Sequence, residues 1–226
     1  MKRHFETELE ELKKNLIKMS SLVEESIKKS VSAVLNRDLQ LAESVINDDY
    51  KINQFEVKIE TEIEQLLALQ TPVATDLRFV LSSVKINNEL ERIGDHAVNI
   101  AQSALYFSKK KIPPSSVEEL TGICNLTREM LKDAIDSLIQ LDIVKGESIL
   151  YKDDMVDNYN KKIIADCIEL IKDNPNKVVD AMELIRISRN LERVADLTTN
   201  IAEDVIFIIN AKNVKHHQSD FNTQQQ

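Results

Sequence analysis

The chain has 226 residues, of which 42% are hydrophobic and 30% charged, with three glycines, four prolines and no tryptophan. So few helix breakers favour long helices, and the length suffices for one or two domains with a hydrophobic core. A formal net charge of −9 argues against nucleic-acid binding. We expect no signal peptide, because no apolar run follows the first residues, and no membrane span, because no apolar run of about 18 residues occurs. We therefore expect a cytoplasmic protein.

The first half of the chain predicts three helices. Apolar residues recur every three or four positions over 5–36, which is typical of one amphipathic helix. A second helix is predicted from Leu39 to Leu69. A third is predicted to begin at Thr75 or Asp76, either of which can serve as its N-cap, and to continue to Ser108.

The segment 109–116 is the clear boundary of the chain, because Pro113 and Pro114 forbid a continuous helix. Three more helices are predicted beyond it, over 117–141, 144–172 and 178–210. The expected fold is all-α, with six long helices in two tandem repeated three-helix bundles. Residues 1–111 form the first repeat, residues 115–212 the second, and residues 213–226 a polar disordered tail.

The two halves share one motif at a shift of 101 residues. Leu90–Ala101 reads LERIGDHAVNIA and Leu191–Ala202 reads LERVADLTTNIA. In each copy Glu, Asp and Asn stand at i, i+4 and i+8, so on a helix they follow one side, each about 40° round from the last. Like charges at this spacing disfavour a helix by roughly 0.2–0.5 kcal/mol per pair, which predicts a cation opposite the row. The residues are Glu91, Asp95 and Asn99, then Glu192, Asp196 and Asn200.

A second acidic row lies on the second predicted helix of each half, at a shift of 104 residues. Asp49 and Asn53 form an i, i+4 pair that Glu56 and Glu60 extend along the same side, and Asp153, Asp157 and Asn160 repeat it. Glu203 lies on the side of Glu192 and Asp196, whereas the first half has Gln102, so the second site is expected to be the more anionic.

Neighbouring antiparallel helices can bring the two rows of each half together, and their oxygens suit a hard cation or a small ion cluster. A solvated charged face is the alternative for a single row, but recurrence in both halves favours a site. The predicted ligands are Glu91, Asp95, Glu192, Asp196, Asp49, Asn53, Asp153, Asp157, Asn99, Asn200 and Glu203.

Three further motif positions are informative. Arg92 and Arg193 recur, and two interpretations stay open, namely a fork of hydrogen bonds that orients a carboxylate or a surface ion pair. His96 has Leu197 as its counterpart, so we expect a partly exposed histidine rather than a ligand. Gly94 corresponds to an alanine, and a small residue there predicts close approach of two helices.

At these residues the sequence resembles the PhoU family, the phosphate-uptake regulators of bacteria. The likeness covers nearly the whole chain and rests on the doubled Leu-Glu-Arg-x-x-Asp-x-x-x-Asn-Ile-Ala and on Gln70–Arg78, which reads QTPVATDLR. The resemblance implies iron or zinc clusters held on the bundle surface by Glu91 with Asp95 and by Glu192 with Asp196. Asn53 stands where that family often has an acidic residue.

The resemblance also implies a cytoplasmic homodimer that contacts the ATPase subunit of a phosphate ABC transporter and a sensor histidine kinase, and that reaches the membrane only through them. In that role it would restrain phosphate uptake and the phosphate-starvation response without catalysing a reaction or binding nucleic acid. Two alternatives remain. A carboxylate-bridged di-metal enzyme would use Glu-x-x-His pairs that this sequence lacks. A purely structural helical scaffold would not explain why Asn99 recurs as Asn200.

Overall fold

The computed structural model describes residues 2–110 and 114–211, and every element within them is helical. The all-α fold of six long helices in two repeats is confirmed. The tail 213–226 and Pro113 lie outside the described residues, so the predictions for them stay predictions. The elements are α1 (Lys2–Asn36), α2 (Leu39–Asp48), α3 (Tyr50–Leu69), α4 (Ala74–Phe107), α5 (Pro114–Gln140), α6 (Ile143–Asp173), a 3₁₀ turn (Pro175–Lys177) and α7 (Val178–Asn210).

The second long helix of the first repeat is interrupted at one residue, so the prediction of an unbroken helix over Leu39–Leu69 is wrong at Asp49. Its torsion angles stay helical, with φ −55° and ψ −35°. The Ile52 N–H donates to the Asp49 carbonyl at 2.9 Å, a bond that spans three residues and tightens the helix locally. In the second repeat α6 runs without a break through the matching Asp153.

The start of α4 also differs from the prediction. The helix begins at Ala74, whose φ is +49°, and the preceding Val73 offers no side-chain cap. Thr75 and Asp76 are therefore not N-caps. Instead the Thr75 hydroxyl accepts a hydrogen bond from Arg78, and Asp76 lies in the first turn, where its charge is favourable to the helix dipole.

The same turn ends the first long helix of each repeat. Arg37 and Leu141 have positive φ values of 56° and 52°, and the next residues, Asp38 and Asp142, cap the following helices. The Asp38 carboxylate accepts from the Leu41 N–H at 3.0 Å. The duplication at a shift of 104 residues is thus expressed in local backbone geometry as well as in sequence.

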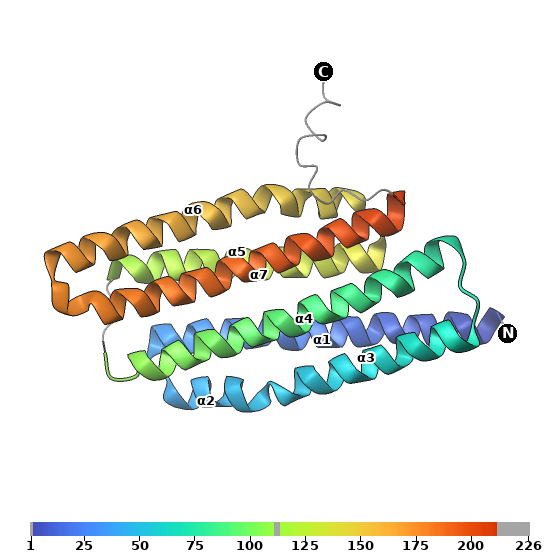
Figure 1. Cartoon of the computed structure of the whole chain (residues 1–226), viewed down its shortest axis with the longest axis horizontal. Helices are drawn as coiled ribbons and strands as arrows, with labels where there is room; N and C mark the ends of the chain where they lie inside the picture. The colour runs from blue at the N-terminus through green and yellow to red at the C-terminus, as the bar shows by residue number, and fades with distance from the viewer. Residues whose placement is uncertain (1, 111–113, 212–226) are drawn as a thin grey trace, which may run out of the picture.

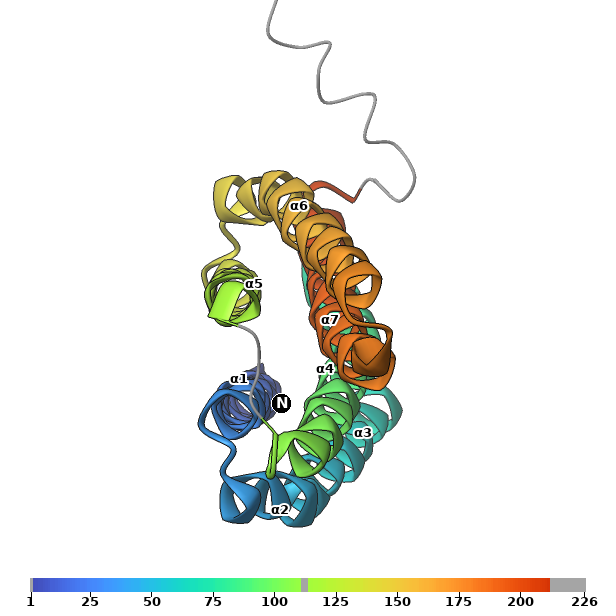
Figure 2. The same cartoon turned by 90° about the vertical axis from the view of Figure 1, so that its left-hand side faces the viewer.

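The helices form two layers (Figures 1 and 2). Helices α3, α4, α7 and α6 lie side by side in one layer, and α1 and α5 lie in the layer behind them. The halves meet where α4 packs on α7 and α1 packs on α5. On α4 the fully buried Leu90, Ile93 and Ala97 form the predicted packing side of the motif helix. The two motif helices are therefore the central pair of the front layer.

Polar links run along the antiparallel α4–α7 contact. Arg78 donates to the Ile208 carbonyl at one end, and Tyr106 donates to Asp180 at the other. Between them lie the Lys85–Asp204 ion pair at 3.1 Å and the Ser103–Glu183 hydrogen bond at 2.7 Å. These links fix the position of one repeat on the other. Among the described helices none is long and apolar enough to cross a membrane.

Candidate metal sites

The two acidic rows of the first repeat face each other. Asp49, at the α2–α3 junction, and Glu56 on α3 lie close to Glu91 and Asp95 on α4. Burial raises the pKa of Glu91, and the charges of Asp95, Glu56 and Asp49 raise it further. A Cβ atom at Gly94 would lie 3.7 Å from the Asp49 Oδ1 and 3.0 Å from Ile52, so the small residue does permit the close approach. These four carboxylates are called the first site.

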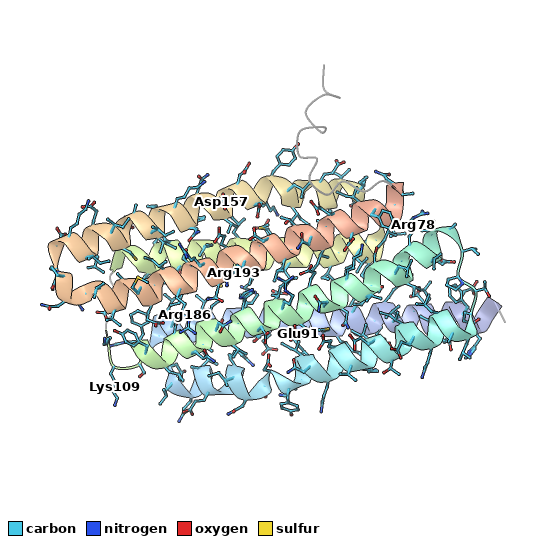
Figure 3. All side chains as sticks on the ribbon, viewed as in Figure 1. Arg78, Glu91, Lys109, Asp157, Arg186 and Arg193 are labelled. Atoms are coloured by element: carbon cyan, nitrogen blue, oxygen red, sulfur yellow. The ribbon has the colours of Figure 1, made fainter. Side chains whose placement is uncertain are left out.

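The second repeat has a corresponding group on α6 and α7. Burial, then the charges of Asp196 and Asp157, raise the pKa of Asp153 to about 6. The pKa of Glu192 is raised by burial and by the same two neighbours. Asp153, Asp157, Glu192 and Asp196 are called the second site. Figure 3 shows Glu91 on α4 and Asp157 on α6, so the sites lie on opposite flanks of the α4–α7 pair.

The charge arrangement of both sites fits a cation. The pKa values of Glu91, Glu192 and Asp196 stay raised even though neighbouring arginines lower them in part, and a bound cation would offset the remaining repulsion. The donors are oxygens, as hard cations prefer. Within the described residues, however, no three His, Cys, Asp or Glu side chains are arranged closely enough to hold a metal ion. The carboxylates face a common space but stand apart, as like charges do.

The two sites are not identical copies. Asn53 donates a hydrogen bond of 3.1 Å to Asp49, which lowers the Asp49 pKa against the larger opposing effect of burial. Its counterpart Asp157 is a carboxylic acid and not an amide. Conversely, the counterpart of Glu56 is Asn160, which is buried and accepts from the Ser188 hydroxyl at 2.7 Å. The acid on the second long helix has therefore moved by about one turn between the repeats.

The amides that end the predicted rows are less clearly placed. The Asn200 side chain donates a long hydrogen bond, 3.4 Å, to Glu89 on α4, and so points toward the other repeat. Asn99 and Glu203 are partly buried on their helices. A role for these three residues as ligands stays a prediction.

Arg92 and His96 have partners outside the acidic rows. Arg92 forms an ion pair with Glu89 at 2.9 Å and acts on Glu91 through its charge alone. The His96 Nδ1 lies 2.9 Å from Asn190 Oδ1, and burial lowers the His96 pKa. Because the Asn190 side-chain N–H donates to the Arg186 carbonyl, its amide oxygen can accept a hydrogen bond from the His96 Nδ1–H.

Sequence reasoning missed Glu89 and Asn190. They stand at matching positions, each directly before the motif, and both make contacts across the α4–α7 interface. The signal that could have found them is their spacing of 101 residues, the same as that of the motif. The pair is easily overlooked because one residue is an acid and the other an amide.

The fold defines a class of protein, a tandem repeat of three-helix units with one group of neighbouring carboxylates in each repeat. Residues 16–104 and 120–205 each match the PhoU domain. The chain belongs to the PhoU family.

Relatives of known name match nearly the whole chain. It is 34% identical over 211 residues to a phosphate-specific transport system accessory protein PhoU homolog of Clostridium acetobutylicum, covering 93% of this chain and 96% of the relative. The crystal structure of PhoU from Pseudomonas aeruginosa superposes with a TM-score of 0.88 at 31% identity, covering 92% of this chain and 100% of that one. The crystal structure of the phosphate transport system regulatory protein PhoU from Streptococcus pneumoniae superposes with a TM-score of 0.85 at 33% identity. The match covers 93% of this chain and 99% of that one. The chain is thus an accessory or regulatory protein of the phosphate transport system.

Proposed function

We propose that this protein restrains phosphate uptake and the phosphate-starvation response by direct contact with the ATPase subunit of a phosphate ABC transporter and with a sensor histidine kinase. It acts in the cytoplasm as a homodimer, without catalysing a reaction, and carries metal in both sites. The observation that carries the metal proposal is the convergence of carboxylates from two neighbouring helices in each repeat. The family and the names of its members support the regulatory role.

Glu91, Asp95, Asp49 and Glu56 would hold the metal of the first repeat, and Glu192, Asp196, Asp153 and Asp157 that of the second. The metal would supply positive charge that offsets the repulsion in each row. Of the two metals that the resemblance implies, iron suits a set made only of oxygens better than zinc does, because structural zinc sites favour Cys and His.

Metal content tests the sites. The untagged protein is purified and its metals are measured, then the measurement is repeated with Glu91, Asp95, Glu192 and Asp196 changed together to Ala. Because the variant removes four of the eight carboxylates, we expect it to lose most of the bound metal. A matched control changes four exposed acids outside the rows, Glu10, Glu64, Glu118 and Asp173, and should keep it. Equal metal in the site variant and the control would contradict the proposal.

A deletion strain tests the regulatory role. Loss of the protein should raise phosphate uptake and the expression of starvation genes when phosphate is plentiful, and the unaltered gene should restore both. Unchanged uptake together with unchanged expression would remove the regulatory proposal, whatever the metal content.

Asn53→Asp should make the first site resemble the second. It replaces a donor to Asp49 with a further carboxylate, so we expect tighter cation binding, by about tenfold, and a metal-free protein less stable by about 1 kcal/mol. Calorimetric titration of the metal-stripped protein and urea unfolding measure the two effects. Weaker cation binding would show that Asn53 serves the site as a positioning residue for Asp49.

A further inference from the structure

The solvent side of α4 carries an ordered strip of side chains that ends at the first site. Leu77, Leu81 and Val84 are 36%, 46% and 43% exposed. The next three positions on the same side of the helix, each about one turn further on, are Asn88, Arg92 and Asp95, and all three are exposed. On an α-helix these six positions fall within about 80° of the circumference and extend over about 27 Å. They are called the first strip.

The solvent side of α7 carries the same arrangement, at the motif's shift of 101 residues. Val178 and Met182 are 44% and 58% exposed, and Ile185 is partly buried. The second strip consists of Val178, Met182, Ile185, Arg189, Arg193 and Asp196. Each strip is therefore apolar over its first two turns and cationic over the next, and it ends at an acidic site.

Duplication distinguishes these apolar residues from exposed apolar residues such as Val57 and Tyr151. Isolated exposed apolar side chains are normal on a protein surface. Val57 on α3 and Tyr151 on α6 are 60% and 67% exposed, but their counterparts are the polar Lys161 and Asn47. In the strips all three apolar positions are apolar in both repeats. Apolar character at an exposed position kept in both copies indicates a surface with a partner.

The charge of the strips indicates what that partner is. In a chain of net charge −9, the second strip exposes Arg189 and Arg193 toward solvent, and the first exposes Arg92, which also pairs with Glu89. His96 on α4 contacts Asn190 on α7, and Glu89, the ion-pair partner of Arg92, accepts a hydrogen bond from Asn200, so the cationic parts of the two strips lie close together at the middle of the α4–α7 pair. A partner that covers leucine and methionine side chains beside guanidinium groups carries apolar and acidic residues together.

The geometry of the front layer sets the number of partners. Helices α4 and α7 are antiparallel neighbours in that layer, and Figure 3 shows Arg186 and Arg193 on α7 beside α4. The apolar ends of the two strips therefore point in opposite directions from a shared cationic centre. Resting on the proposed function, we propose that each strip docks one acidic amphipathic helix of the regulated partner protein, so that one chain of this protein holds two copies of it.

The experiment measures binding of the full-length protein to two purified probes, the transporter ATPase subunit and the cytoplasmic part of the sensor kinase from the same organism. The test variant is Leu81→Glu with Met182→Glu, and we expect it to weaken binding at least about tenfold. The control, Val57→Glu with Tyr151→Glu, adds the same charges at exposed apolar positions outside the strips and should change binding less than about twofold. Thermal unfolding should be unchanged in both, because all four side chains are exposed.

Two further readouts distinguish docking on the strips from a general loss of affinity. Either single substitution should reduce the stoichiometry from two partner chains to one. Arg92→Gln with Arg193→Gln should weaken binding and also reduce its dependence on salt, because fewer ionic contacts remain.

Three outcomes would overturn the inference. If the unaltered protein binds a probe and Leu81→Glu with Met182→Glu binds it equally well, the strips are not the docking surface, although the proposed function stands. If the double variant instead dissociates a dimer of this chain in sedimentation, the strips contact a second copy. If the unaltered protein binds neither probe, the proposed partner contacts fail and this inference fails with them.

Discussion

In the metal-free protein, Asp153→Asn is expected to raise the free energy of unfolding by about 1–2 kcal/mol near neutral pH. Burial and the charges of Asp196 and Asp157 raise the Asp153 pKa to about 6, so the folded state resists its ionisation. The full rise in the Asp153 pKa corresponds to about 3 kcal/mol of destabilisation. We expect only about 1–2 kcal/mol, because the carboxylate is partly exposed and solvent screens its charge. The asparagine keeps the shape of the side chain and removes the charge.

The pH dependence of this gain identifies its cause. Between about pH 4 and pH 6 the folded protein holds the Asp153 proton more tightly than the unfolded chain does, so the stability contributed by this group falls as pH rises through that range. The difference between Asp153→Asn and the unaltered protein should therefore be near zero below about pH 4 and reach its full size above about pH 6. Urea unfolding in chelator-treated samples across this range measures it.

The duplicated structure supplies a matched control. Asp49→Asn, at the same position of the first repeat, should gain less, because Asn53 donates a hydrogen bond to the Asp49 carboxylate. When metal is added, Asp153→Asn should lose affinity at the second site, so that stability and cation binding change in opposite directions. A variant that is no more stable than the unaltered protein at neutral pH would show that the carboxylates do not repel one another in solution.

The architecture could be predicted because the sequence marks it in several independent ways. Apolar periodicity gives the helices, Pro113 and Pro114 separate the halves, and the shifts of 101 and 104 residues relate one half to the other. The interruption at Asp49 could not be predicted, since it involves no glycine or proline and keeps helical torsion angles. The start of α4 was misjudged because Ala74 adopts a positive φ that its side chain does not indicate.

The candidate sites were predictable in outline only. Convergence of the rows follows from the adjacency of consecutive helices in an antiparallel bundle. The hydrogen bond from Asn53 to Asp49, and the exchange of Glu56 for the buried Asn160, depend on side-chain directions that spacing does not fix. The sequence therefore indicated which helices contribute to each site, but not that the second long helix places its acid about one turn apart in the two repeats.

Asp180→Asn is expected to lower the free energy of unfolding by about 2–3 kcal/mol at neutral pH, the largest loss that we predict for one polar substitution. Asp180 is only 6% exposed, at the end of the α4–α7 interface. Burial alone would raise its pKa. Hydrogen bonds from Lys177 at 2.8 Å, Lys110 at 2.9 Å and Tyr106 at 2.7 Å lower the Asp180 pKa to about 2.

The two lysines come from different repeats, so the substitution tests how the repeats are joined. An asparagine still accepts a hydrogen bond, but it leaves the ammonium groups of Lys110 and Lys177 without their counter-charge. A folded pKa below the unfolded value contributes stability that is present above about pH 4 and is lost as pH falls toward 2. The deficit of Asp180→Asn should accordingly shrink to about half by pH 3.

Unfolding by urea at several pH values measures this deficit, and Asp173→Asn, an exposed acid at the end of α6, is the control expected to change stability by less than about 0.5 kcal/mol. Because α4 belongs to the first repeat and α7 to the second, loosening their contact should also make the unfolding of the two repeats separable. A single cooperative transition with unchanged stability would mean that the apolar contact of α4 with α7 joins the repeats without help from Asp180.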